Sequence, residues 1–230
     1  MQINNIYNID CIQGIQQLEN QSIDLVLIDP PYFKVKGDFD FALSFQEWKN
    51  LHYQLALEIK RVCKLSANII IWGGHMLHEQ VIIFNQFFYY LQKCVWHKID
   101  GIGNLQRVNK HCRKPPTLAE FFILYALHDD QFLRRRNLNR VYNNIYKHSN
   151  IYSYSQQSNI TQKYAHPTQK PEKLTSNLIE VLSNEQQNIL IPFVGSGTEC
   201  AMAKKLNRNF IGFELDKKYF DIALNRINTI

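Results

Sequence analysis

Four consecutive residues, Asp29, Pro30, Pro31 and Tyr32, directly follow the apolar run 23–28. The run predicts a buried parallel strand, so the four residues would lie at its carboxyl end, where open α/β sheets bind ligands. The prolines stiffen the backbone and leave carbonyls free to accept hydrogen bonds, Asp29 adds a carboxylate, and Tyr32 adds an aromatic face. This set suits a planar base with an exocyclic amine, since stacking on an aromatic ring contributes roughly 1–3 kcal/mol. On its own, the tetrapeptide is also consistent with an ordinary proline-rich turn.

A glycine motif follows a second apolar run. Residues 188–191 predict a strand, and the segment 192–198 contains Gly195 and Gly197, which permit a tight turn before a helix over 199–206. A Gly-x-Gly pattern alone is weak evidence for a nucleotide site.

An acidic residue at the end of the next strand strengthens that evidence. The predicted strand 209–213 ends in Glu214, about 20 residues after the glycines, where a nucleotide-binding βαβ unit places the acid that binds ribose hydroxyls. The alternative is that Glu214 caps the helix that begins near Asp216.

Together these motifs resemble the S-adenosylmethionine-dependent DNA amino-methyltransferases, and in particular the β group of adenine-N6 and cytosine-N4 enzymes, whose cofactor glycines come last in the chain. The resemblance spans nearly the whole sequence. It implies an α/β fold with a Rossmann-like methyltransferase sheet, mostly parallel with an antiparallel strand pair, a circularly permuted motif order and a small recognition insert. It assigns catalysis to Asp29, Pro30, Pro31 and Tyr32. It assigns cofactor binding to Asp10, Cys11, Asp29, His166, Thr168, Lys170, Phe193, Gly195, Ser196, Gly197, Thr198 and Glu214.

Two residues depart from the family pattern. Ile9 stands where a glycine usually precedes Asp10, and Ile191 stands where an acidic residue usually precedes Pro192 and Phe193. In the family that acid helps to position the methionine part of the cofactor. Ile191 is therefore the feature that favours the alternative of a DNA-binding relative that has lost catalysis.

The resemblance also implies a mechanism. The target base rotates out of duplex DNA, Tyr32 stacks on it, and Asp29 and the Pro30 carbonyl accept hydrogen bonds from its amine during in-line methyl transfer. We predict adenine N6 as the target, because Asp at the first motif position mostly accompanies adenine in this family and Ser accompanies cytosine N4. Cytosine N4 is the alternative. Guanine-N2 methylation of RNA is a further one, although those enzymes have the opposite motif order.

Charge indicates a nucleic-acid partner. Residues 93–148 contain eleven Lys and Arg against four Asp and Glu, a net charge of +7 in a chain whose total is +6. A positive field confined to one segment suits phosphate contact with double-stranded DNA. The predicted contacts are Arg107, Lys110, Arg113, Lys114, Arg134, Arg135, Arg136 and Arg140. Interleaved aromatics favour a nucleic-acid surface over a merely solvated face, namely Phe132, Tyr142, Tyr146, Tyr152 and Tyr154.

Composition favours one enzyme domain spanning 1–230, with a target-recognition insert over 128–164. The chain has 230 residues, of which 45% are hydrophobic, and it has five cysteines without a Cys-x-x-Cys pair. These features predict a cytoplasmic protein without disulfides, export signal or membrane span. A zinc site is disfavoured and no metal is expected, because the His and Cys pairs fall on different predicted elements. The resemblance leaves a cognate restriction endonuclease and a homodimer open as partners.

The remaining elements follow from hydrophobic periodicity. The segments 101–116 and 33–45 are expected to be loops, the first of them basic. The predicted strands are 3–9, 67–72, 89–99 and 118–127, the last two paired, and the predicted helices are 11–19, 47–65, 77–88, 173–182 and 217–227.

Overall fold

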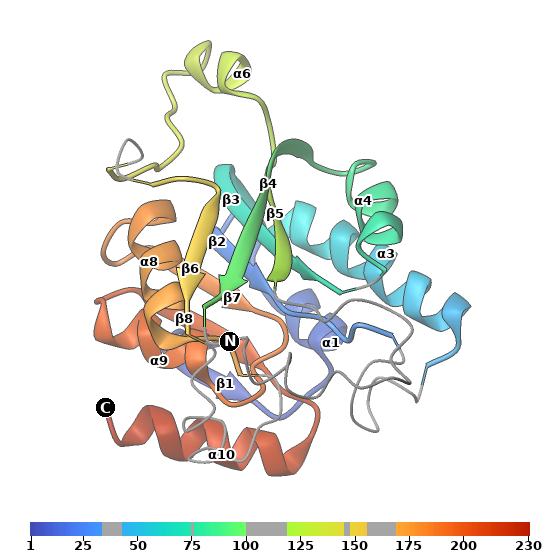
Figure 1. Ribbon diagram of the computed structural model, residues 1–230, viewed down its shortest axis with the longest axis vertical. Coiled ribbons are helices and arrows are strands. Elements are labelled where there is room, and N and C mark those ends of the chain that lie inside the picture. The colour runs from blue at the N-terminus through green and yellow to red at the C-terminus, as the bar shows by residue number, and fades with distance from the viewer. Residues whose placement is uncertain (34–42, 75, 100–118, 145–147, 156–168) are drawn as a thin grey trace.

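The computed structural model describes residues 1–33, 43–74, 76–99, 119–144, 148–155 and 169–230, and the statements below concern these residues. Their centre is an eight-stranded sheet in the order β1-β8-β7-β2-β3-β5-β4-β6 (Figure 1). All neighbouring strands are parallel except that β5 runs antiparallel to both β3 and β4. The strands are β1 (Asn5–Tyr7), β2 (Ile23–Ile28), β3 (Cys63–Gly73), β4 (Tyr89–Lys98), β5 (Ala119–Ala126), β6 (Ile151–Tyr154), β7 (Asn188–Ile191) and β8 (Asn209–Phe213).

Helices cover both faces of the sheet and enclose two apolar clusters (Figure 1). One face packs against α1 (Cys11–Gln16), α3 (Phe45–Val62) and α4 (Leu77–Phe84). The other packs against α8 (Glu172–Leu182), α9 (Thr198–Lys205) and α10 (Lys217–Asn228). The short helix α6 (Asp130–Arg134) follows β5. This three-layer arrangement confirms the predicted Rossmann-like α/β fold.

The switch point of the sheet lies between β2 and β7. The chain leaves β2 through α3 toward β3, and leaves β7 through α9 toward β8 on the opposite side. Leu25 pairs with Ile189 and Val26 with Leu190, so the carboxyl ends of the two strands lie side by side. Open α/β sheets bind their ligands in the crevice at such a point.

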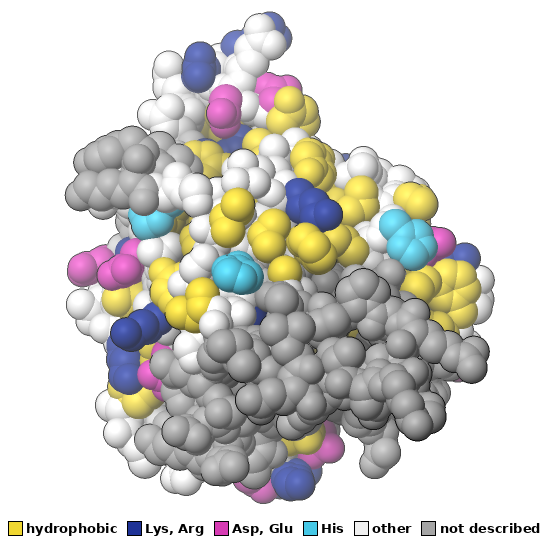
Figure 2. Space-filling model, in the orientation of Figure 1, with side chains coloured by type: hydrophobic (Ala, Val, Ile, Leu, Met, Phe, Trp, Pro, Cys, Tyr) yellow, Lys and Arg dark blue, Asp and Glu magenta, His cyan; other side chains and the backbone are white. Residues whose placement is uncertain are grey.

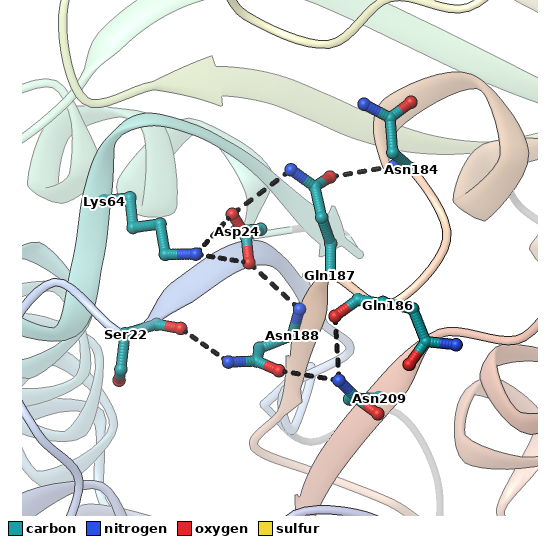
Figure 3. A network of polar contacts seen from close by, with 8 residues as sticks. All are labelled: Ser22, Asp24, Lys64, Asn184, Gln186, Gln187, Asn188 and Asn209. Atoms are coloured by element: carbon teal, nitrogen blue, oxygen red, sulfur yellow. Dashed lines mark hydrogen bonds and ion pairs between the residues drawn. The ribbon is translucent and has the colours of Figure 1, made fainter.

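A polar network ties the opposite, amino ends of these strands together (Figure 3). Both carboxylate oxygens of Asp24 accept from the Lys64 ammonium at 2.9 Å, and one accepts from the backbone N–H of Asn188 at 3.0 Å. The Asn188 side chain donates to the Ser22 carbonyl at 3.0 Å and accepts from Asn209 at 3.2 Å. The register of β2, β3, β7 and β8 is thus fixed by hydrogen bonds as well as by apolar packing.

Most predicted elements are present, with shifted ends. β2, β7 and β8 have the predicted bounds, whereas α3 ends at Val62 and β3 begins at Cys63, four residues earlier than predicted. Cys63 pairs with Ile23, so the sheet takes up residues that the helical pattern had included.

β6 was not predicted, and it changes the role of several tyrosines. It adds to the sheet edge by pairing in parallel with β4, and Trp96 Nε1 donates to the Tyr154 carbonyl at 3.0 Å. Tyr142, Tyr152 and Tyr154 pack against the apolar cluster instead of forming a nucleic-acid surface, so that prediction is wrong for these three. Strand alternation turns Tyr152 and Tyr154 to the same, inner face. Tyr146 lies outside the described residues.

Several sequence expectations concern cysteines, metals and membranes. Cys11, Cys63, Cys94 and Cys200 are free and buried. Within the described ranges, no cluster of three or more His, Cys, Asp or Glu side chains is arranged to hold a metal ion. No helix in the described part of the chain has the length and hydrophobicity to cross a membrane.

The network at the amino ends makes a testable prediction about stability. Asp24→Ala should lower the free energy of unfolding by about 2 kcal/mol, because the Asn188 N–H loses its acceptor. Lys64→Met is the matched variant, and it should cost less than about 1 kcal/mol since the Lys64 side chain is 42% exposed. Urea denaturation measures both. Equal losses would show that the ion pair, and not the backbone hydrogen bond, is the stabilising contact.

Candidate active site

The turn after β2 is held from the side of α3. The Pro31 carbonyl accepts from Nε1 of Trp48, a fully buried residue of α3, at 2.8 Å. Phe33 has φ of 60°, a region that bulky residues rarely adopt, and its ring lies 5.6 Å from that of Phe45. Packing thus holds a strained turn in place, as is common at functional sites. No described residue donates to the Pro30 carbonyl, which the sequence analysis had named as a substrate acceptor.

The carboxylate of Asp29 is the centre of the site. Its Oδ1 accepts from the Tyr32 hydroxyl at 2.7 Å, and its Oδ2 accepts from the Lys170 ammonium at 2.6 Å. Lys170 also donates to the Tyr32 hydroxyl oxygen at 3.2 Å. The Asp29 side chain is 26% exposed and that of Lys170 only 3%. The resemblance assigns Lys170 to the cofactor and only the ring of Tyr32 to the substrate, whereas both side chains orient Asp29 here.

Lys170 connects Asp29 to a second pair of charges. Its ammonium lies 3.5 Å from Glu120, at the start of β5, and Glu120 accepts from Lys98, at the end of β4, at 2.6 Å. Burial would lower the pKa of Lys170, but the carboxylates of Asp29 and Glu120 outweigh it and raise that pKa. Burial would raise the pKa of Glu120, but Lys170 and Lys98 outweigh it and lower that pKa. Lys170 and Glu120 are therefore both charged. A lone acid in an otherwise apolar strand was the only sequence signal for Glu120.

The ring of Tyr32 rests on the end of β3. A Cβ atom at Gly74 would lie 2.9 Å from that ring, so a side chain there would displace Tyr32. The ammonium of Lys170 lies 5.4 Å from the ring centroid. Gly74 is thus part of the site, although the sequence analysis treated it only as the end of a strand.

The glycine loop after β7 is joined to the end of β8. Gly195 and Gly197 have φ of 52° and 78°, the left-handed region that favours glycine. The Gly195 N–H donates to Glu214 Oε2 at 2.8 Å, and Oε1 accepts from the Asp216 N–H at 2.9 Å. Burial raises the pKa of Glu214. Asp216, not Glu214, caps α10. Because a carboxylate has about four acceptor positions, Glu214 can accept further hydrogen bonds from a ligand.

Arg226 on α10 holds the same loop through hydrogen bonds, and this role was not predicted. Its fully buried guanidinium donates to the Ser196 carbonyl at 3.1 Å, to Thr198 Oγ1 at 2.9 Å and to Glu172 Oε1 at 2.7 Å. Ser196 and Thr198 are themselves buried, so their side chains serve the shape of the loop. An Arg between Ala223 and Ile227, on the apolar stripe of the last predicted helix, was the available signal.

The segment before α1 lies near Glu214. Asp10 caps α1, with Oδ1 accepting from the N–H groups of residues 12 and 13. Cys11 is buried, and burial, then Asp10 and also Glu214, raise the pKa of its thiol to about 12. The thiol is therefore a packing group, and Asp10 is the more accessible of the two predicted contacts. Phe193 packs against the cluster that contains Cys11.

Ile191, at the family's usual acidic position, is fully buried in the core. An acid lies nearby on the next element: Glu199, in the first turn of α9, is partly buried. Burial and the charge of Asp29 raise its pKa to about 7. The sequence analysis had treated Glu199 only as the start of a helix.

The predicted DNA contacts that the structure describes are not gathered at this site. β5 runs antiparallel to β3, and its last residue, Ala126, pairs with Asn68 in the middle of β3. The chain therefore leaves β5 toward the amino end of β3, and α6 lies at the end of the sheet opposite Asp29 (Figure 1). The exposed residues 134–136 lie on α6 and just after it, and basic side chains project there at the top of Figure 2. Six predicted residues lie outside the described ranges, namely Arg107, Lys110, Arg113, Lys114, His166 and Thr168.

Arg140 is a correction to the predicted DNA contacts. Its side chain is only 2% exposed, and it donates to Asp130 and to the His128 carbonyl, each at 2.7 Å. It therefore holds the segment after β5 together and is not available to a phosphate. The basic composition of the segment gave no sign of this pairing.

The sequence and the fold were compared with known proteins. The chain is 29% identical over 235 residues to the Type II methyltransferase M.HpaI of Haemophilus parainfluenzae, covering 96% of this chain and 73% of that protein. The crystal structure of the M1.HpyAVI–SAM complex has a TM-score of 0.74 at 22% identity, covering 97% of this chain and 98% of that one. The cytosine-N4-specific PvuII DNA methyltransferase also has a TM-score of 0.74, at 18% identity, covering 96% and 85%.

The family assignment rests on the sequence. A family model described as DNA methylase, for N6 and N4 methyltransferases, matches residues 23–225. That match spans the turn after β2, the glycine loop and Glu214. The chain belongs to the N6/N4 DNA methylase family.

Proposed function

We propose that this protein is a site-specific DNA methyltransferase that transfers a methyl group from S-adenosylmethionine to the N6 amine of a flipped-out adenine in duplex DNA. The observation that carries the proposal is the position of Asp29 at the switch point, beside the glycine loop and Glu214. A carboxylate that could accept hydrogen bonds from the target amine thus lies next to the loop that we propose binds the nucleotide part of the cofactor. Similarity to a Type II methyltransferase supports action on DNA.

The residues around the glycine loop fit the cofactor. S-adenosylmethionine supplies a methyl group that its sulfonium already activates for attack by a neutral amine. Glu214 retains acceptor capacity for the ribose hydroxyls, since a carboxylate has about four acceptor positions and its described donors are the backbone N–H groups of residues 195, 215 and 216. Asp10 uses only Oδ1 in capping α1, so Oδ2 is available to the adenosine part. His166, Thr168 and Lys170 are further residues to which the resemblance assigns cofactor binding.

Asp29 acts on the target amine through positioning and charge. Tyr32 donates to one Asp29 oxygen and Lys170 donates to the other. Each oxygen therefore keeps a second lone pair that can accept from the hydrogens of the target amine. Together with the Pro30 carbonyl, Asp29 aims the nitrogen lone pair at the methyl carbon. As the N–C bond forms and the C–S bond breaks, positive charge develops on nitrogen next to the carboxylate. The surplus proton then leaves the nitrogen. This electrostatic complementarity to the transition state supplies rate.

Adenine is favoured over cytosine by Asp29 alone, through the association seen in the family. The fold does not discriminate, because the cytosine-N4-specific PvuII methyltransferase has the same architecture. Cytosine N4 remains the second candidate. A cognate restriction endonuclease and a homodimer are proposals that rest on the resemblance, and a cytoplasmic location is a proposal that rests on the composition.

The phosphate contacts are proposed to come from the edge of the sheet that carries Asp29. Lys98 and Glu120 are linked to Asp29 through Lys170, and they border the basic segment that contains Arg107, Lys110, Arg113 and Lys114. A duplex whose base enters the site must pass close to this edge. Arg134, Arg135 and Arg136 lie at the far end of the sheet and are the weaker candidates.

Product analysis tests the proposed function. The purified protein, incubated with S-adenosylmethionine and duplex DNA, should form N6-methyladenine, detected by mass spectrometry of the digested nucleosides. Asp29→Asn should lower the single-turnover rate at least 100-fold, because it removes the charge that the developing cation meets. Its cofactor affinity should stay within about tenfold of wild type. Formation of N4-methylcytosine would overturn the choice of adenine, and an Asp29→Asn rate equal to wild type would overturn the mechanism.

Two substitutions of Tyr32 separate its ring from its hydroxyl. Tyr32→Phe should slow methyl transfer about tenfold, since Asp29 loses one of the two groups that orient it. Tyr32→Ala should be slower still, because the stacking face is lost as well. Single-turnover kinetics with saturating DNA measure both rates. If the two variants are equally slow, stacking has no separate role.

Salt titration distinguishes the two basic regions. Replacing Arg107, Lys110, Arg113 and Lys114 with Gln should flatten the dependence of log affinity on log salt by about 0.9 for each phosphate that the protein no longer neutralises. Replacing residues 134–136 with Gln is the matched control and should change that slope by less than the amount expected for a single phosphate. Fluorescence anisotropy with labelled duplex measures both. The reverse result would place the DNA track along α6.

A further inference from the structure

Glu199 is an acid without a counter-ion inside the candidate site. It follows the glycine loop directly and is partly buried. No described residue forms an ion pair with it, and its own backbone N–H donates to its carboxylate. A buried carboxylate is ordinarily paired, because burial without a partner disfavours its charged form.

The neighbouring charges do not remove this imbalance. Lys170 is committed to Asp29 and Glu120, and Arg226 to Glu172 and the glycine loop. These two cations lower the pKa of Glu199 only from a distance, whereas burial and Asp29 raise it to about 7. Cys200, the next residue, supplies no charge, because burial raises the pKa of its thiol and keeps it neutral. Among the described residues, Glu199 therefore has no cation of its own.

The methyl donor brings such a charge to this place. An amine held on Asp29 must meet the methyl carbon in line, so the sulfonium would lie close to Asp29. Because β2 and β7 pair in parallel, the turn that carries Asp29 lies beside the loop that leads into Glu199. The amino group of the methionine part is a second cation attached to the same end. Ile191, where the family usually has the acid for this part, is fully buried and offers only hydrocarbon.

We propose that Glu199 binds the cationic methionine end of S-adenosylmethionine, and so takes over the work of the acid that Ile191 replaces. The inference rests on the proposed function. The negative charge that the family usually has at the end of β7 would in this chain lie in the first turn of α9, on Glu199. The loss of catalysis considered for Ile191 then does not follow.

The proposal predicts a proton linked to binding. In the free protein Glu199 is about half protonated near pH 7. A bound cation favours the ionised carboxylate and lowers its pKa, so binding near pH 7 releases protons. Affinity should therefore rise with pH by up to roughly tenfold per pH unit below pH 7, and level off above it.

Calorimetry of the full chain with S-adenosylmethionine tests this directly. At pH 6, 7 and 8, in buffers of different ionisation enthalpy, wild type should bind more tightly as pH rises and release protons near pH 7. Glu199→Gln should bind about 10- to 100-fold more weakly at pH 8 and lose this release. Measurements on the variant also remove the ionisation of the ligand itself from the comparison. Glu185→Gln, at an exposed acid, is the charge-matched control and should behave as wild type.

S-adenosylhomocysteine identifies which cation Glu199 meets, because it lacks the sulfonium charge and keeps the amino group. Proton release retained with this ligand assigns the contact to the amino group, and its absence assigns the contact to the sulfonium. Wild type that binds S-adenosylmethionine without proton release near pH 7 overturns the inference, whatever the folding of the variants. No binding of S-adenosylmethionine by wild type at any pH overturns the proposed function instead.

Discussion

The parallel pairing of β2 with β7 is the constraint on which the site depends. These strands lie far apart in the sequence, and Asp24 and Asn188, which bond at their amino ends, are 164 residues apart. Pairing brings the turn after β2 beside the glycine loop, so the carboxylate and the nucleotide loop share one edge. A slip of one residue would turn every side chain to the other face. The network around Asp24 therefore sets the geometry of groups at the far end of the sheet.

Charge balance is the second organising feature. Lys170 is almost fully buried, and it is stable there because Asp29 and Glu120 lie on either side of it, with Lys98 beyond. Buried ions cost free energy unless they are paired, and apolar replacements are often at least as stable. The buried ion pairs of Lys170 at this edge are therefore better explained by chemistry than by stability. The glycine loop depends on a second ion pair, in which Glu172 holds the guanidinium of Arg226 that supports the loop.

The sequence predicted features that are local. Buried parallel strands are continuous apolar runs between turn residues, which is why 23–28, 188–191 and 209–213 had the right bounds. β6 has only four residues in a polar segment, and its tyrosines gave the pattern of a stacking surface. Its inner face became evident only from its pairing with β4.

Contacts between side chains from distant elements were not predictable. Lys170 was recognised, but its partner Asp29 is 141 residues away, and nothing in either local pattern encodes the pairing. The same holds for Arg140, whose burial depends on how the segment after β5 folds back. Glu214 was predictable because a βαβ unit fixes its spacing from the glycines. Glu199 follows the glycines much more closely in the sequence, but its lack of an ion-pair partner among the described residues is a property of the folded chain.

The permuted order of the motifs has a consequence for how the chain folds during synthesis. β2 pairs with β7 on one of its two sides, and in the described sheet β1 is an edge strand that pairs with β8. Neither of these first two strands can therefore complete its pairing before residues 188–213 are made. Contacts of such long sequence separation form slowly, because loop closure costs entropy before they add stability. The nascent chain therefore carries unpaired apolar strand edges for most of its synthesis, the state in which chains aggregate or engage chaperones. Because β7 and β8, which carry the predicted cofactor-binding residues, come late in the sequence, the active-site crevice is one of the last features to form during folding.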